Sequence, residues 1–202
     1  MTDDRTVFDP SDEDVNAYKL LNSLVVPRAI AWVSTIDAQG RGNLAPHSFF
    51  TVACVDPPIV AFTSVGRKDS LRNVEATGEM TIALAPESLV DEVNATAADF
   101  SHDRDEFAEV GLEREPSTKV RPPRVARSPV ALECVLHSTT CFGDSTMVFG
   151  RVVHAAVATD ALVDGHPEIG RLAPLARLGG DEWSTIGTIL ERRRIRAADW
   201  PT

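Results

Sequence analysis

Short apolar segments with the composition of β-strands recur along the first half of the chain. AIAWVSTI, residues 29–36, is apolar and β-branched, and NLAPHSFFTVACV, residues 43–55, resumes this pattern after the turn-forming DAQGRG. The two segments predict a hairpin, whose second strand ends at the following DPP. IVAFTSV, residues 59–65, and MTIALAP, residues 80–86, predict two further strands.

The second half of the chain repeats the strand pattern at greater length. VALECVLHSTTCF, residues 130–142, and TMVFGRVVHAAVA, residues 146–158, flank the short turn GDS and predict a long hairpin of the kind found in barrels. ILERRRI, residues 189–195, is a candidate for a last strand.

Helical spacing is found in three places. A loop rich in polar residues leads into LRNVEAT, which predicts a helix over residues 70–77 that stops at Gly78. Residues 88–100 and 103–111 carry apolar side chains at intervals of three and four among many acids, which predicts solvated amphipathic helices covering a barrel end.

The remaining segments connect these elements. Prolines make residues 113–129 an extended connection, and Gly and Pro limit residues 162–187 to short helical turns. Residues 1–17 predict a flexible acidic N-terminal arm, followed by one domain over residues 18–202. Strands without βαβ alternation predict a mainly β fold, an antiparallel barrel with peripheral helices.

Composition and charge narrow the classes of function. The 202 residues are 43% apolar and 25% charged, in the range of an ordinary globular domain. The net charge of −10 opposes binding to a nucleic acid backbone. We find no apolar run long enough for a membrane helix and no signal peptide in the acidic N-terminus, so we expect a cytoplasmic protein without a membrane partner.

The cysteines indicate neither disulfides nor a metal centre. Cys54, Cys134 and Cys141 are odd in number and lack CxxC spacing, so we expect reduced, mostly buried thiols.

Common catalytic signatures are also missing from the chain. It contains no GxSxG, HExxH, GxGxxG or GxxxxGK[ST], and its five histidines are scattered over different segments. We therefore assign no catalytic acid, base or nucleophile.

The loop TSVGRKDS, residues 63–70, carries the clearest chemical signal. The Lys68 ammonium, the hydroxyls of Ser64 and Ser70, and the free N–H groups of a helix start together complement a phosphate. Asp69 would repel that phosphate, so we expect it to cap the helix or pair with a nearby arginine. The alternative is an ordinary solvated, capped helix start.

A resemblance covers the chain from about Leu20 to Ile195. It rests on PRAIAWVSTIDAQGRGNLAPHSFF, DPPIVAFTS, RKDSLRNVEATGE, LEC, FGRVVHA and RLGGDEW, in this order and spacing. This set resembles the flavin reductase-like, FMN-binding split-barrel family, and NLAPHSFF and KDS are its most specific parts.

The resemblance implies a six-stranded Greek-key barrel that works as a homodimer with one FMN per subunit. Along the isoalloxazine ring it places Asn43, Ala45, Pro46, His47 and Ser48, and around the ribityl chain and phosphate it places Thr63, Ser64, Lys68, Asp69 and Ser70. Arg28 is a further phosphate candidate. Trp183 would either cover the ring from the partner subunit or pack at the rim of its own barrel.

The implied activity is transfer of a hydride from NADH or NADPH to flavin, with reduced flavin passing to a partner such as a monooxygenase. This reaction needs two stacked rings and no obligatory acid or base, which agrees with the absence of a triad. An FMN electron carrier and a non-catalytic flavin-binding protein are the alternatives. The ERRRIR cluster, residues 191–196, is either a patch for dinucleotide phosphates or a solvated basic edge.

Overall fold

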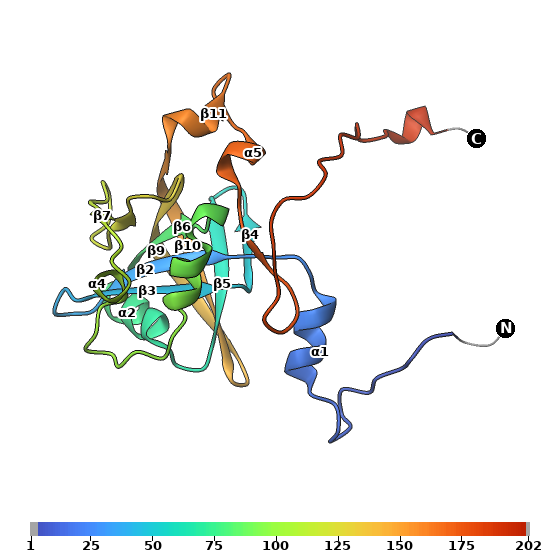
Figure 1. The fold of residues 1–202 in the computed structure, drawn as a ribbon, viewed down its shortest axis with the longest axis horizontal. Helices are drawn as coiled ribbons and strands as arrows, with labels where there is room; N and C mark the ends of the chain where they lie inside the picture. The colour runs from blue at the N-terminus through green and yellow to red at the C-terminus, as the bar shows by residue number, and fades with distance from the viewer. Residues whose placement is uncertain (1–3, 201–202) are drawn as a thin grey trace.

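A computed structural model describes residues 4–200 of the chain, and its centre is an antiparallel sheet that curls into a barrel (Figure 1). Seven strands follow one another in the order β3-β2-β6-β9-β10-β5-β4. Their bounds are β2 Ala31–Ile36, β3 Gly42–His47, β4 Phe50–Cys54, β5 Ile59–Val65, β6 Glu79–Leu84, β9 Val130–Phe142 and β10 Ser145–Val157. The predicted mainly β, antiparallel barrel is confirmed.

The two predicted hairpins are present, but the second strand of the first one is divided. β2 pairs with β3 from Ala31↔His47 to Ile36↔Gly42, and β9 pairs with β10 along most of its length. We predicted one strand over residues 43–55; instead the chain breaks after His47 and resumes at Phe50. β3 and β4 consequently lie at opposite ends of the strand order, and the barrel is split between them. The sheet has six strands only if these two halves are counted as one.

The helix after β5 forms where the spacing predicts it. α2 spans Asp69–Thr77 and ends at Gly78, whose φ of 73° is a left-handed conformation that glycine adopts without steric cost. The two predicted acidic helices are much shorter than their patterns: α3 is Val90–Ala95, after a 3₁₀ turn at Glu87–Leu89, and α4 is Glu106–Glu109. The chain between α3 and α4 is a loop.

Short elements make up the rest of the described chain. They are α1 Ala17–Leu24, β1 Arg28–Ala29, β7 Arg114–Glu115, β8 Arg124–Val125, a 3₁₀ turn Thr159–Ala161, β11 Leu162–Val163, β12 His166–Pro167, α5 Ile169–Leu172, β13 Ala176–Arg177, β14 Trp183–Ser184 and a 3₁₀ turn Ala197–Asp199. β1, β13 and β14 form a small separate sheet. The predicted strand over residues 189–195 is wrong, because this stretch is exposed and has no strand partner to bury its apolar side chains.

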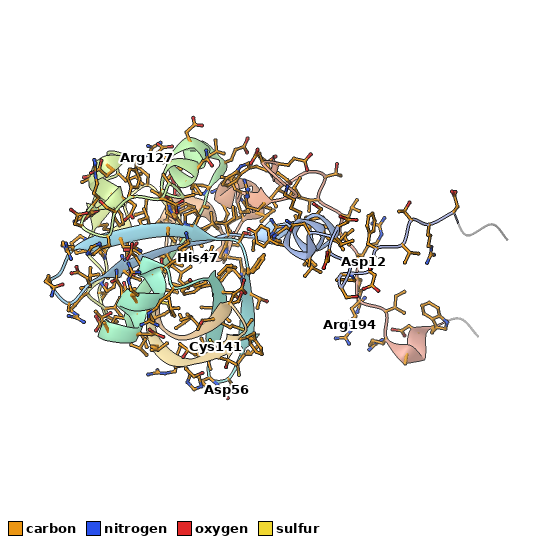
Figure 2. The ribbon with its side chains drawn as sticks, turned by 90° about the horizontal axis from the view of Figure 1, so that it is seen from below. Asp12, His47, Asp56, Arg127, Cys141 and Arg194 are labelled. Atoms are coloured by element: carbon orange, nitrogen blue, oxygen red, sulfur yellow. The ribbon has the colours of Figure 1, made fainter. Side chains whose placement is uncertain are left out.

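Both ends of the chain leave the barrel on the same side (Figures 1 and 2). Residues 4–16 form no helix or strand and are mostly exposed, as expected for an acidic arm, while residues 1–3 lie outside the described part. The flexibility of this arm and its boundary at residue 17 stay predictions.

Two apolar clusters fill the space on either side of β2. Trp32 points into the first with Leu44 and Phe107, and its Nε1 donates a hydrogen bond to Thr96 Oγ1 at 2.9 Å. The second cluster contains the neighbours of Trp32 on β2 together with Phe62 and the apolar face of α2. Because consecutive residues of a strand face opposite ways and both faces of β2 are covered, all six of its residues are buried, including the polar Ser34 and Thr35.

The three cysteines are free thiols, as predicted. Cys134 is buried, which raises the pKa of its thiol to about 12 and leaves it unreactive. Cys54 is half-buried, and Cys141 is exposed, so the prediction of mostly buried thiols is wrong for Cys141.

A buried carboxylate attaches the proline-rich connection, residues 113–129, to the barrel. Glu133 on β9 is fully buried and accepts hydrogen bonds from the backbone N–H groups of Thr118 at 2.9 Å and Lys119 at 2.5 Å. Arg124 adds two guanidinium contacts at 3.0 and 2.6 Å. Burial alone would raise the pKa of Glu133, but these donors outweigh it and hold the pKa below its usual value.

Replacing Glu133 with Gln should therefore destabilise the fold by about 3 kcal/mol, because it removes the buried one of the two carboxylates that pair with Arg124. Glu115→Gln is the matched control, since Glu115 pairs with the same arginine at 2.8 Å from a half-exposed position and should cost less than about 1 kcal/mol. Urea denaturation measures the free energy of unfolding of both variants. Equal losses would contradict the larger contribution assigned to the buried Glu133.

Candidate functional site

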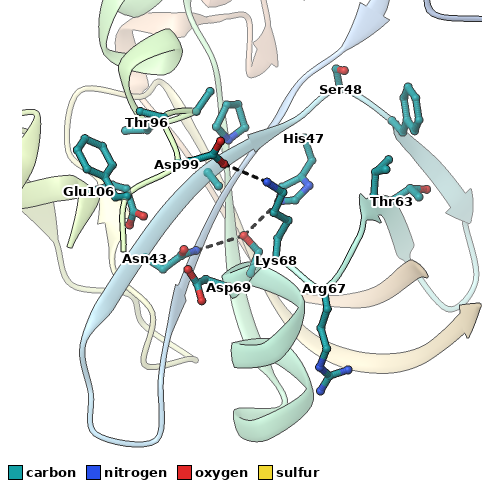
Figure 3. A pocket seen from close by; sticks show the side chains of 18 of the residues that line it. Asn43, His47, Ser48, Thr63, Arg67, Lys68, Asp69, Thr96, Asp99 and Glu106 are labelled. Carbon is teal, nitrogen blue, oxygen red and sulfur yellow. Dashed lines mark hydrogen bonds and ion pairs between the residues drawn. The ribbon is translucent and has the colours of Figure 1, made fainter. Parts of the chain in front are cut away.

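A cavity of about 440 Å³ opens where β3, the end of β5 and the first turn of α2 meet the loop after α3 (Figure 3). Its volume lies within the roughly 300–1,000 Å³ of small-molecule sites. The lining residues are Tyr18, Asn43, Ala45, Pro46, His47, Ser48, Phe49, Thr63, Val65, Arg67, Lys68, Asp69, Ser70, Arg72, Thr96, Ala97, Ala98, Asp99, Phe100 and Glu106. The two segments that the sequence singled out, residues 43–48 and 63–70, thus line one cavity.

One wall of the cavity is the exposed end of β3. Ala45 and Pro46 are half-buried there and offer apolar contact, and the His47 ring packs at a tilt on Phe62 with 4.6 Å between the ring centroids. Burial lowers the pKa of His47 to about 4, although a hydrogen bond to the Thr63 backbone favours the charged form. His47 is consequently neutral at pH 7.

Asn43 fastens this wall to the first turn of α2. Its Nδ2 donates to Thr35 Oγ1 at 3.0 Å and to Ser70 Oγ at 3.2 Å, and all three side chains are buried. His47 Nε2 lies 3.1 Å from the same Ser70 oxygen. The Ser70 hydroxyl thereby joins the helix to two positions of β3.

The first turn of α2 presents positive groups to the cavity. Gly66, with φ of 74°, turns the chain out of β5, and Lys68 is the N-cap residue, with no side chain capping the helix start. Backbone N–H groups at an uncapped helix start are free to bind an anion. Lys68 Nζ instead lies 3.1 Å from Asp99 Oδ1, and Asp69 pairs with Arg72, one of the two roles expected for it.

Three of the predicted site residues lie outside this cavity. Ser64 is fully buried and donates to the Gly66 carbonyl at 2.8 Å, which stabilises the turn. Arg28 is buried and donates to backbone carbonyls, including Leu178 at 2.8 Å.

Trp183, the third, packs against the first apolar cluster of its own chain. The Arg177 guanidinium lies 4.5 Å from its ring centroid. This placement matches the rim-packing alternative, and coverage of a flavin from a partner subunit stays a prediction.

Residues 96–100 and Glu106 line the cavity as well, although no pattern in the sequence singled them out. The spacing of residues 88–100 predicted a helix, but α3 ends before Thr96 and the chain continues as a loop. The Thr96 hydroxyl donates to Val93 O at 3.0 Å and accepts a hydrogen bond from Trp32 Nε1. Glu106 is 6% exposed and accepts the Leu44 N–H at 3.0 Å. Burial raises the pKa of its carboxyl group.

Neither a membrane-spanning helix nor a cluster of metal ligands is present in residues 4–200. None of the described helices has the length and apolar character needed to cross a membrane. Within the same residues, no three His, Cys, Asp or Glu side chains gather as a set of metal ligands.

Comparison with known proteins supports one family. The model of the flavin reductase like domain matches residues 23–172. An uncharacterized protein of Deinococcus radiodurans is 35% identical over 196 residues, which cover 91% of this chain and 86% of that protein.

Solved structures agree with this match. Nitrilotriacetate monooxygenase component B from Bacillus cereus superposes with a TM-score of 0.86 at 28% identity, covering 93% of this chain and 98% of the other. A putative flavin reductase with a split barrel domain from Shewanella frigidimarina NCIMB 400 has the same fold, with a TM-score of 0.82 at 23% identity over 91% and 95% of the two chains. Domain match, fold and cavity together show that this chain belongs to the flavin reductase-like family of split-barrel proteins.

Proposed function

We propose that this chain is an NAD(P)H-dependent FMN reductase that passes reduced flavin to a separate oxygenase. The observation that carries the proposal is the cavity, which joins the apolar end of β3 to an uncapped helix start bearing Lys68. The likeness to a protein named as a monooxygenase component supports the partner oxygenase.

The donors and apolar surfaces of the cavity suit FMN. Ala45 and Pro46 offer a flat apolar surface to the ring, while Lys68, Ser70 and the free N–H groups of α2 suit the phosphate. When bound, flavin supplies an N5 atom that accepts a hydride from the nicotinamide. The chain holds the ring, orients it and excludes water, and neutral His47 places no charge on this wall.

We also propose a homodimer. The only buried residue of α1 is Asn22, whereas its apolar side chains Leu21 and Leu24 are more than half exposed. Ile189 and Leu190 near the C-terminus are exposed as well, on the side of the barrel where both tails emerge (Figure 1). A second copy would bury these apolar groups. Light scattering measures the mass, and a strictly monomeric protein would contradict the dimer.

The function is tested by steady-state oxidation of NADH and NADPH with FMN, FAD or riboflavin added. Rapid oxidation that depends on added flavin is the expected result. A yellow protein that oxidises neither nicotinamide but exchanges electrons with a protein partner would be an electron carrier. Bound flavin without any turnover would leave a binding protein.

Lys68→Ala should weaken FMN binding about tenfold and leave riboflavin unchanged, because riboflavin lacks the phosphate that the ammonium would contact. Ser70→Ala should act in the same direction, whereas Ser70→Thr keeps the hydroxyl and should have little effect. Fluorescence titration with both flavins measures these affinities.

Asp99→Asn is the matched control in the loop after α3. It removes the carboxylate that pairs with Lys68 and should tighten FMN binding a few-fold while riboflavin binding stays the same. Equal changes for both flavins in either variant would mean that the loop shapes the ring site and does not hold the phosphate.

His47 gives a pH dependence of stability. The unfolded chain takes up a proton near pH 6.5 and the folded chain only near pH 4, so the neutral buried ring stabilises the fold above pH 6.5. That stabilisation is lost as the pH falls from 6.5 to 4. Over this range the wild type should lose about 3 kcal/mol more than His47→Gln. Urea denaturation at a series of pH values measures it, and parallel curves would disprove the depressed pKa.

A further inference from the structure

Glu106 is a buried acid whose position the fold specifies closely. It begins α4, only 6% of it is exposed, and its Oε2 accepts the Leu44 N–H at 3.0 Å. β3 is an edge strand whose neighbour in the sheet is β2. On its other side no strand of the described chain is present to accept the Leu44 N–H. One oxygen of Glu106 therefore satisfies the free edge of β3.

The second oxygen of Glu106 is left for another donor. Among the described residues, none other than Glu106 itself donates to Oε1, and the side chain lines the cavity (Figure 3). Burial is the main cause of the raised pKa of this carboxyl group, and the nearby Asp105 and Glu109 raise it further. The backbone N–H groups of Glu106 and Leu44 lower this pKa but do not outweigh burial. A ligand that donates to Oε1 would supply the missing partner.

The location of Glu106 indicates which part of a ligand would meet it. Its partner Leu44 stands on β3 between two segments that line the cavity. On one side, Asn43 reaches Ser70 at the start of α2, where the phosphate is proposed to bind. On the other side, residues 45–48 form the wall proposed for the ring. A chain that joins these two regions would run along the stretch of β3 that Glu106 contacts.

We propose that Glu106 binds the ribityl chain of the flavin, with Oε1 accepting hydrogen bonds from its hydroxyl groups. This inference rests on the proposed flavin site. The phosphate is excluded as the contact, because two negative charges would repel one another in a buried position. Hydroxyl groups are neutral donors and suit a carboxylate oxygen to which no other described residue donates. Glu106 would thus select flavins that carry the polyol.

Glu106→Gln tests this assignment with the Leu44 contact preserved, since the amide oxygen still accepts that N–H. The variant loses the charge and replaces the second acceptor with a donor. Titrations with lumiflavin, which has the ring without the ribityl chain, with riboflavin and with FMN separate the parts of the ligand. We expect riboflavin and FMN to bind roughly tenfold more weakly and lumiflavin to bind as before.

Glu109→Gln is the control, because Glu109 lies on the same helix but pairs with Arg104 outside the cavity. It should leave all three affinities unchanged, and thermal unfolding verifies that both variants are folded. Equal weakening for lumiflavin would overturn the proposal by showing that Glu106 acts through the ring wall. Unchanged riboflavin binding in Glu106→Gln would overturn it as well. Failure of the wild type to bind any flavin would instead refute the proposed function.

Discussion

The hydrogen bonds of the Asn43 amide link the barrel to the helix that completes the cavity. Asn43 begins the exposed wall of β3, and a single Nδ2 group contacts Thr35 on β2 and Ser70 on α2. Buried amide groups must be paired, because an unsatisfied one costs about 1–3 kcal/mol. The helix start is therefore held at one distance from the strand. The ring wall and the cationic helix turn can act on one ligand because this link keeps them adjacent.

Charge around the helix start is arranged in pairs. Arg67, Lys68 and Arg72 all line the cavity, and their partners are Glu75, Asp99 and Asp69 respectively. Two of these carboxylates belong to α2 itself, whereas Asp99 reaches across from the loop after α3. Under the proposed function, a phosphate that binds Lys68 would replace Asp99 without disturbing the ion pairs of Arg67 and Arg72.

Local sequence signals predicted the elements whose stability is itself local. The hairpin of β2 and β3, the strand β5 and the helix ending at Gly78 follow from periodicity, turn residues and capping. The prediction of a strand over residues 189–195 was wrong, because the described part of the fold offers this stretch no strand to pair with. The break at residues 48–49 also escaped prediction, since it results from closing the barrel and not from a turn signal. Tertiary geometry decides such features.

The same distinction applies to the site. Residues 63–70 were singled out by their residue types and residues 43–48 by the family resemblance, and nine of the twelve predicted positions line the cavity. Arg28 and Ser64 lie outside it. A cation or hydroxyl near a phosphate loop is chemically suitable wherever it points, and only the fold shows that both donate to backbone carbonyls. Glu106 was not predicted, because nothing in its sequence context distinguishes it. In sequence it is one acid among many on a short acidic stretch, and it becomes distinctive only when β3 provides the unpaired Leu44 N–H that holds it. A carboxylate that binds the free edge of β3 thereby also lines the cavity, where we propose that it contacts the ligand.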